Sequence, residues 1–290
     1  MSTARLSVIV PAYNESGVIR DCLARLLGEI DSIHEVLVVD NNSSDDTRSI
    51  VDEFAAVNPK FSVIFEKEQG LIPARDTGFD SATGEILARI DADTRVGEGW
   101  ADAVAAFLAA HGDDLEGGSG LCSFYDAPFQ ERFRRRHDEL TAQMLARPEV
   151  PREHNRLFGS NMAITAKAWG SIRTATSRRD DVFEDLDIAL CLRSLGARVG
   201  LIPGADVTIS GRRFRTGPIS QIRYCLCDQR TYKIHGRASE RRGAILTMIL
   251  VTLPFYSVMY LPFRLYDPDT GTFSISALWR KDRAGVRAHA

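Results

Sequence analysis

The sequence has no cysteine pattern that would indicate a disulfide-linked or zinc-binding protein. Its five cysteines are an odd number without regular spacing. Cys225 and Cys227 are separated by a single residue, which is too close for the usual zinc-binding pair, and no histidine pair at ligand spacing lies nearby. We therefore expect reduced, mostly buried thiols in a cytoplasmic protein.

The sequence also contains no glycine-rich dinucleotide-binding motif after its first strand-like run, and no apolar segment before that run. No Gly-x-Gly-x-x-Gly follows the first strand-like run, Leu6–Val10, which argues against a dinucleotide-dependent oxidoreductase. The residues before that run, Met1–Arg5, contain no apolar segment, so we expect no cleaved signal peptide.

The charge of the 290-residue chain is unevenly distributed. Its formal net charge is −3, but residues 1–120 contain 22 acidic and 9 basic side chains (net −13), whereas residues 121–290 contain 17 acidic and 27 basic ones (net +10). The length is sufficient for one large α/β domain or for a domain with an appendage. The basic second half suggests phosphates or an anionic membrane surface as partners, and we expect no nucleic-acid partner.

Short apolar runs alternate with helical patterns over the first 110 residues. The expected strands are Leu6–Val10, Val36–Val39, Phe61–Phe65 and Ile86–Ile90, and the expected helices are Gly17–Ile30, Asp45–Val57, Pro73–Thr83 and Trp100–Ala110. Apolar, β-branched strands with intervening helices predict a mostly parallel, Rossmann-like central sheet that helices cover on both faces.

Polar residues follow each of these four strands at the carboxyl end. They are Tyr13-Asn14-Glu15, Asp40-Asn41-Asn42, Lys67-Glu68-Gln69 and Asp91-Ala92-Asp93. Ligands of open α/β sheets bind outside the carboxyl ends of the strands, so we expect a binding site along this edge. Two carboxylates separated by one small residue, Asp91 and Asp93, can hold a divalent cation and, through it, a diphosphate.

The middle of the chain is less regular. Gly117–Gly120 is expected to form a flexible turn before a strand at Leu121–Phe124. A basic helix is expected at Pro128–Ala146, which contains three consecutive arginines, Arg134–Arg136. The pattern at Glu184–Leu195 predicts a further helix, with Gly196 at its end.

The last part of the chain is basic and then apolar. Residues 212–242 contain nine basic and two acidic side chains, and Ala244–Phe263 has no charge. That run is long enough to cross a hydrocarbon core, but we expect Pro254 and Pro262 to break it. A true span, a hairpin or a pair of interfacial helices, and a buried core helix all remain open. The basic stretch before it is expected on the cytoplasmic side of the membrane.

Several of these segments together resemble family 2 glycosyltransferases. They are Val8-Ile9-Val10-Pro11-Ala12-Tyr13-Asn14-Glu15, Val38-Val39-Asp40 with the polar run to Thr47, Ala74-Arg75-Asp76-Thr77-Gly78, Asp91-Ala92-Asp93 and Glu184-Asp185. The resemblance implies an α/β GT-A fold with a C-terminal basic and hydrophobic helical tail. It divides the chain into a nucleotide-sugar-binding half (1–115), an acceptor-binding half (116–210) and a membrane-associating segment (211–290).

The resemblance also implies roles at the donor site. Pro11, Tyr13 and Glu15 are expected to line the base and ribose pocket, Asp40 to accept hydrogen bonds from the nucleoside, and Arg75 to lie near the nucleotide. Asp91 is expected to contact the ribose or the metal, and Asp93 to bind Mn²⁺ or Mg²⁺. The expected donor is a UDP- or GDP-sugar. The family usually has Asn at the position of Asp76, so a pair between Asp76 and Arg75 is the alternative role for these two residues.

A base for the acceptor is expected at the start of the Glu184–Leu195 helix. Sugar transfer with inversion requires a carboxylate that removes the acceptor proton from the face opposite the leaving group, and Asp185, ahead of Glu184, fits this requirement. Crowded acidic groups raise one another's pKa, which favours such a base near neutral pH. The alternative is that these acids only favour a helix N-terminus.

Two other segments are expected at the acceptor and at the diphosphate. Gly159, Ser160 and Asn161 resemble the segment beside the acceptor pocket of the family, and a plain turn is the alternative. Arg212 and Arg213 resemble arginines that face the departing diphosphate, and a solvated or membrane-facing patch is the alternative. Gln221-Ile222-Arg223-Tyr224 matches the Gln-x-x-Arg-Trp motif of processive members only in part, so we infer no polymer synthesis.

We therefore expect a metal-dependent, inverting glycosyltransferase at the cytoplasmic face of the cell membrane, peripheral or anchored through about 244–263. Its acceptor would be a hydroxyl of a glycan, a cell-envelope sugar or a lipid-linked sugar. One alternative is a polyprenyl-phosphate sugar synthase, whose phosphate acceptor needs little help from a base. A catalytically silent nucleotide-binding membrane subunit is the other, although the joint presence of Asp91, Asp93 and Asp185 argues against it.

Overall fold

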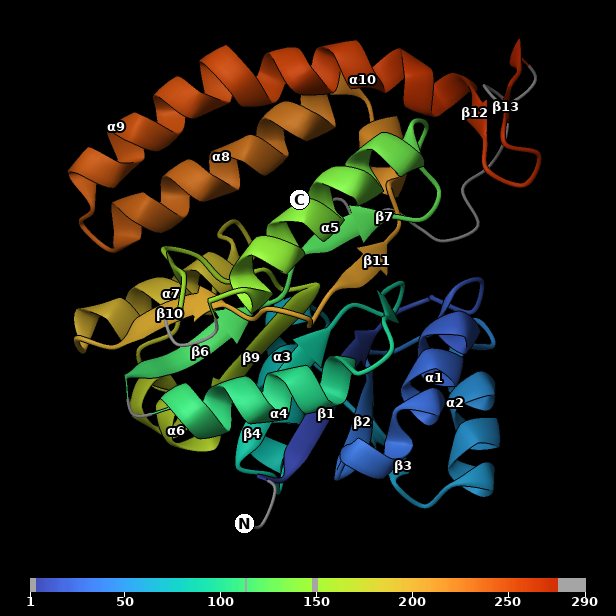
Figure 1. Cartoon of the computed structure of the whole chain (residues 1–290), viewed down its shortest axis with the longest axis vertical. Helices are drawn as coiled ribbons and strands as arrows, with labels where there is room; N and C mark the ends of the chain where they lie inside the picture. The colour runs from blue at the N-terminus through green and yellow to red at the C-terminus, as the bar shows by residue number, and fades with distance from the viewer. Residues whose placement is uncertain (1–3, 113, 148–150, 276–290) are drawn as a thin grey trace.

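A computed structural model describes residues 4–112, 114–147 and 151–275 of the chain. Its centre is an eight-stranded sheet with the strand order β3-β2-β1-β4-β9-β6-β10-β8 (Figure 1). Strands β3, β2, β1 and β4 run parallel, β9 runs antiparallel between β4 and β6, and β10 is parallel to β6. The predicted α/β class with a mostly parallel sheet is confirmed.

The first half contains the predicted alternation of strands and helices. The strands are β1 (Leu6–Ala12), β2 (Glu35–Asp40), β3 (Phe61–Phe65), β4 (Ile86–Ile90) and the short β5 (Arg95–Val96). The helices are α1 (Ile19–Gly28), a short 3₁₀ turn at Ile30–Ser32, α2 (Thr47–Val57), α3 (Leu71–Ser81) and α4 (Trp100–His111). The expected boundaries differ from the observed ones by at most two residues.

Helices cover both faces of the sheet because successive strand residues point to opposite sides. In β1, Val8 and Val10 pack into a core with α1, α2 and α4, whereas Ile9 packs into a second core with α3, α6 (Ala166–Ile172) and α7 (Glu184–Ser194). The two cores fix the carboxyl ends of β1 and β4 side by side at one edge of the sheet.

The expected turn at Gly117–Gly120 is wrong for its first three residues, since they belong to the central strand β6 (Leu115–Ser119). A Cβ at Gly117 would lie 2.8 Å from Ile164 Cγ2, and one at Gly118 would lie 2.7 Å from Ile202 Cγ1. Glycine is therefore required for close packing here rather than for a turn.

The remaining elements complete the second half. They are β7 (Cys122–Phe124), α5 (Gln130–Leu145), β8 (Glu153–His154), β9 (Asn161–Thr165), β10 (Arg198–Leu201) and β11 (Val207–Ile209). Strands β5, β11 and β7 form a separate three-stranded sheet. A 3₁₀ turn, η2 (Arg212–Arg215), then leads to α8 (Pro218–Ile234).

The tail is one long helix, so the expected interruption at the prolines is wrong. Helix α9 (Ala238–Thr247), a π-helical turn (Met248–Thr252) and α10 (Leu253–Leu265) follow one another without a gap, and Figure 1 shows this helix beside α8. Pro254 is the second residue of α10, two positions after the π turn, where the wider backbone accommodates a residue that has no N–H. A hairpin, β12 (Tyr266–Asp267) and β13 (Thr272–Phe273), follows; residues 276–290 of the expected tail lie outside the described residues.

Candidate active site

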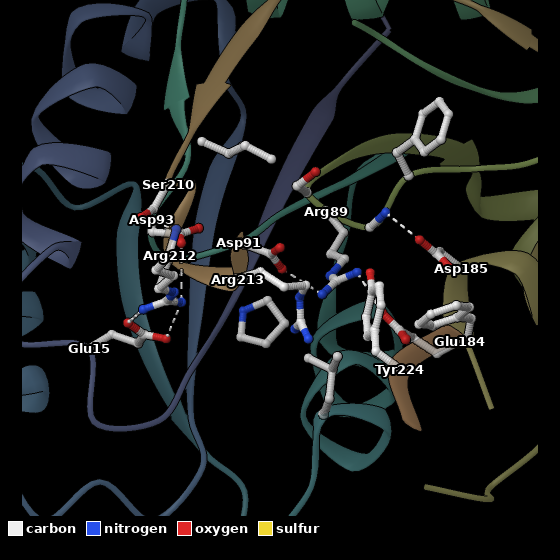
Figure 2. A pocket seen from close by; sticks show the side chains of 18 of the residues that line it. Glu15, Arg89, Asp91, Asp93, Glu184, Asp185, Ser210, Arg212, Arg213 and Tyr224 are labelled. Carbon is white, nitrogen blue, oxygen red and sulfur yellow. Dashed lines mark hydrogen bonds and ion pairs between the residues drawn. The ribbon is translucent and has the colours of Figure 1, made fainter. Parts of the chain in front are cut away.

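A pocket of about 330 Å³ opens at the sheet edge where the carboxyl ends of β1 and β4 meet the start of α7 and the turn η2. Its polar lining consists of Glu15, Arg89, Asp91, Asp93, Ser160, Glu184, Asp185, Ser210, Arg212 and Arg213. Figure 2 shows Glu15, Asp93 and Arg212 on one side of it, with Glu184 and Asp185 on the other. The structure thus brings together residues that the sequence predicted for three different roles.

The turn after β4 places Asp93 in a buried position. Thr94 N donates to Asp91 O at 2.9 Å, and Thr94 Oγ1 donates to Ser160 O at 3.1 Å, so this turn is held against the Ser160 segment. The pKa of Asp93 is raised to about 7; burial is the largest cause, the charge of Arg212 opposes it, and the charges of Asp91, Glu15 and Asp126 act in the same direction as burial. A carboxylate whose charge costs free energy in this way favours a bound cation.

The guanidinium of Arg212 pairs with the carboxylates of Glu15 and Asp93. Its Nη1 and Nη2 each donate to Glu15 at 2.9 Å, and Nη2 lies 3.1 Å from Asp93 Oδ2 (Figure 2). Asp126 fixes the backbone before it by accepting from Ser210 Oγ at 2.6 Å and from Gly211 N. Asp93 and Asp91 offer carboxylate oxygens, which are the ligands that Mn²⁺ and Mg²⁺ prefer, so these two residues fit a divalent cation; each also pairs with an arginine, Asp93 with Arg212 and Asp91 with Arg89.

Arg89 is a site residue that the sequence interpretation missed. Its Nη2 donates to Asp91 Oδ1 at 2.6 Å and its Nη1 to Glu184 Oε1 at 2.8 Å, so one buried guanidinium joins the two sides of the pocket. The signal was present in the sequence, because Arg89 is the one charged residue in the apolar strand β4. A buried charge has to be paired, which marks such a position for attention.

Asp185 lies at the first turn of α7 and lines the pocket. Its Oδ2 accepts from Gly159 N at 2.9 Å and its Oδ1 from Leu186 N at 2.7 Å. The pKa of Asp185 is raised to about 6; burial is the largest cause and the charge of Glu184 adds to it, whereas Arg156, Arg89 and the bond from Gly159 N oppose them. Glu184 itself is paired with Arg89, so Asp185 is the carboxylate of this pair that is better placed to exchange a proton with a ligand.

The three residues expected at the acceptor divide between two environments. Gly159 and Ser160 line the pocket. The side chain of Asn161 points instead into the protein, where Oδ1 accepts from Trp100 Nε1 at 3.0 Å and Nδ2 donates to Ala205 O at 2.7 Å. These bonds give Asn161 a structural role at the start of β9, and the structure does not bring its side chain to the pocket.

Three residues expected at the nucleotide do not line this pocket. Tyr13 is half-buried in the turn after β1, and Asp40 Oδ1 accepts from Ser43 N at 3.1 Å at the end of β2. Arg75 is fully buried; its Nε donates to Asp76 Oδ1 at 2.8 Å and its Nη1 to Glu184 O at 3.3 Å. The alternative pair of Arg75 with Asp76 is therefore present.

An aromatic wall lies next to Glu184 and Asp185. Phe124, Phe183, Phe214, Tyr224 and Tyr256 line it. Arg213 stacks over the Tyr224 ring, with its guanidinium carbon 4.0 Å from the ring centroid. Because Tyr224 lies on α8 and Tyr256 on α10, the C-terminal helices form part of the pocket.

Gly159→Ala should strongly impair the site. A Cβ at residue 159 would lie 1.7 Å from Arg89 Nη1 and 3.1 Å from Glu184 Oε1. It would therefore push Arg89 away from Glu184 and break the ion pair that links the two sides of the pocket. We expect turnover to fall about 10²-fold, the scale of a 1 Å misplacement of reacting groups, together with a lower Tm. Gly170→Ala is the matched control, since a Cβ there meets nothing within 4 Å on α6, and it should leave both values unchanged or raise Tm slightly. Normal turnover of Gly159→Ala would contradict the role assigned to Arg89.

The sheet order and the carboxylate edge define the molecule as an α/β enzyme fold of the GT-A type. The model of the family "Glycosyl transferase family 2" matches residues 7–185, and the chain belongs to this family.

Curated relatives match part of the chain. Glycosyltransferase AglE of Haloferax volcanii is 37% identical over 117 residues, which cover 39% of this chain and 38% of the relative. Uncharacterized glycosyltransferase YfnE of Bacillus subtilis is 31% identical over 149 residues, 48% of this chain and 37% of the relative. The chain thus spans about two fifths of the length of these relatives.

Solved structures share the fold over most of the chain. Mannosyltransferase PcManGT from Pyrobaculum calidifontis, in complex with GDP-Man and Mn²⁺, has a TM-score of 0.63 at 20% identity and covers 96% of this chain and 78% of its own. S. aureus TarS 1-349, in complex with UDP-GlcNAc, has a TM-score of 0.56 at 15% identity, and the match covers 90% of this chain and 79% of the TarS chain. At these identities the similarity shows the fold.

Proposed function

We propose that this enzyme is a metal-dependent, inverting glycosyltransferase that moves a sugar from a UDP- or GDP-sugar to a hydroxyl of a cell-envelope or lipid-linked acceptor. The observation that carries the proposal is a single pocket with the carboxylates Asp91 and Asp93 on one side and Asp185 on the other. Structural neighbours in complex with GDP-Man and Mn²⁺ or with UDP-GlcNAc support the donor class and the metal.

Each side of the pocket has its own part in the reaction. Asp93 and Asp91 would hold the divalent cation, which when bound neutralises the charge on the diphosphate leaving group. Arg212 would exchange its contact with Asp93 for one with the diphosphate while it keeps its two bonds to Glu15. Asp185 would take the proton of the acceptor hydroxyl at the opposite side, which is the arrangement that inversion requires.

Release of nucleotide tests this proposal. A panel of UDP- and GDP-sugars with an acceptor extract should give UDP or GDP in the presence of Mn²⁺ or Mg²⁺ and none in the presence of EDTA, read by mass spectrometry. The anomeric configuration of the product, read by NMR, should be opposite to that of the donor. Retention of configuration, or turnover that ignores both metals, would rule the mechanism out.

A second candidate is a polyprenyl-phosphate sugar synthase, in which the acceptor is a phosphate. One observation favours it: Arg213 lies over Tyr224 beside the wall that continues to Tyr256 on the apolar helix, so a cation and apolar rings adjoin the acceptor side. A phosphate acceptor carries its own negative charge and needs little help from Asp185.

The proposed base predicts the pH dependence of turnover. Asp185 acts as a base only when ionised, and its pKa is raised to about 6. With saturating Mn²⁺, which keeps Asp93 ionised, kcat/KM should be constant above pH 7 and fall about tenfold per pH unit below pH 6. The measurement is a kcat/KM profile from pH 4.5 to 8.5 with a hydroxyl acceptor. A rate that stays level down to pH 5 would contradict the assignment.

A further inference from the structure

The apolar tail helix contacts the folded domain near both of its ends. Ala244 packs against the buried cluster that contains Leu186 and Tyr232. Phe263 is 2% exposed and stacks on Phe214 with ring centroids 4.5 Å apart. On length and composition, Ala238–Leu265 is the one helix among the described residues that could cross a membrane.

These two contacts decide how the helix can lie. Ala244 and Phe263 are 19 positions apart, which corresponds to about 28 Å along a helix, close to the thickness of a hydrocarbon core of about 30 Å. A helix that crossed the bilayer would carry one of the two contacts to the far side of the membrane, away from Leu186 or from Phe214. With both contacts in place, the helix runs along the surface of the domain, as Figure 1 shows.

The π turn at Met248–Thr252 sets the two faces of this helix. At about 100° per residue, Ala244 and Phe263 would point about 100° apart in an uninterrupted α-helix. A π turn takes up one extra residue, which brings the two side chains onto the same face. By the same count, Leu246 and Val258 fall together on the opposite face. The irregular turn thus gives a straight inner face and a straight outer face.

The outer face is apolar and exposed. Its side chains are 42–66% exposed and are Leu246, Ile249, Leu250, Val251, Phe255, Val258 and Leu261. Ile219, Ile222 and Ile234 of the neighbouring α8 are also exposed. Large apolar side chains exposed along one face of a helix mark an interaction surface.

Exposed cations are present on the same helices. Arg223 and Lys233 on α8 and Arg242 on α9 are exposed. An amphipathic layer with basic residues beside its apolar face binds anionic lipid surfaces, where each cation contributes about 1 kcal/mol. A second copy of the same face would bring like charges together, so charge favours the lipid as the partner.

We infer that α8 and the α9–α10 helix dock in the plane of an anionic phospholipid surface, with the outer face of α9–α10 among the lipids and without crossing the bilayer. Tyr256 on the inner face lines the pocket, so the aromatic side of the pocket adjoins the lipid surface. From this position we infer that a lipid-linked acceptor enters the pocket from the membrane, and this part of the inference rests on the proposed function.

Vesicle flotation of the full chain tests the docking. Binding to phosphatidylcholine vesicles that contain 30% phosphatidylglycerol should exceed binding to pure phosphatidylcholine at least tenfold, and salt should weaken it. Leu250→Glu with Val258→Glu should reduce binding at least tenfold; both side chains are exposed, so the fold should tolerate them. Val57→Glu, at an equally exposed apolar position on α2, is the control. Equal binding to both kinds of vesicle, or concentration-dependent dimers in place of binding, would overturn the inference.

The depth of labels along the helix tests its orientation. An environment-sensitive fluorophore on Leu246→Cys, Phe255→Cys or Leu261→Cys should report the same shallow depth at all three positions when lipids brominated at different acyl carbons quench it. Depths that change steadily from 246 to 261 would show a crossing helix and overturn the in-plane orientation.

A separate measurement distinguishes this inference from the proposed function. Flotation and label depth require neither donor nor metal, so they stand if no glycosyl transfer is found. For the entry of a lipid-linked acceptor, Leu250→Glu with Val258→Glu should lose transfer to acceptors in vesicles at least tenfold and keep metal-dependent hydrolysis of the donor in water. Unchanged transfer to vesicle-bound acceptor would contradict entry from the membrane.

Discussion

Asp93→Ala should reduce metal-dependent turnover at least 10³-fold, because it removes the carboxylate that would hold the cation against the diphosphate. Its stability should change little. The native fold disfavours the charge of Asp93, whose pKa is raised to about 7, and Arg212 keeps two bonds to Glu15 when Asp93 is removed. The expected pattern is a folded protein with a normal Tm, weak Mn²⁺ binding by calorimetry and no release of nucleotide.

The matched control is Asp52→Ala, which removes an exposed carboxylate from α2 and should leave turnover and metal binding unchanged. Asp93→Asn separates charge from volume: it keeps the shape of the side chain and should be nearly as inactive. If Asp93→Ala kept a tenth of the wild-type turnover with an unchanged requirement for Mn²⁺, the metal would have to be held elsewhere.

The first half of the fold was predictable because its signals are local. Strands such as Ile86–Ile90 are short apolar runs, and each is followed by a helix with one apolar face, so the pattern of hydrophobic residues determines both. The second half depends on contacts between distant segments. Gly117 and Gly118 indicate a turn when taken alone, yet they form a central strand because Ile164 and Ile202 leave no space for side chains.

The candidate site was predictable to the extent that its residues end a strand or start a helix. Asp91, Asp93 and Asp185 stand at such positions, and all three line the pocket. What the sequence did not indicate is which partners the chain brings together. Arg89 and Glu184 are 95 positions apart, Glu15 and Arg212 are 197 apart, and only the folded sheet shows that each pair is in contact.

The C-terminal helix shows a different limit of prediction from the sequence. Proline normally ends a helix, and from the sequence Pro254 was expected to do so. The π turn before Pro254 preserves the helix and brings Ala244 and Phe263 onto one face, where Phe263 stacks on Phe214. Because such contacts join segments that are far apart in the sequence, the question of a span or a surface helix was open in the sequence.

Asp185→Asn is expected to separate the two candidate acceptors. With a hydroxyl acceptor, loss of the base should reduce kcat by 10²- to 10³-fold and remove the fall of kcat/KM below pH 6. With a polyprenyl phosphate acceptor, the loss should stay within about fivefold, because that oxygen is already ionised at neutral pH. The measurement is turnover with each acceptor class from the same donor, with donor affinity from calorimetry.

Three further observations make the Asp185→Asn result specific to a base. Donor affinity should be unchanged, because the metal and diphosphate contacts are on the other side of the pocket (Figure 2). Asn keeps only one oxygen for the two N–H groups of Gly159 and Leu186, so Tm is measured beside turnover to separate loss of the base from a local structural defect. Glu184→Gln breaks the pair with Arg89 but retains Asp185, so it should lower turnover and keep the acidic limb of the pH profile. If Asp185→Asn kept that limb while Glu184→Gln lost it, Glu184 would be the base, and the order in which we rank the two carboxylates would be reversed.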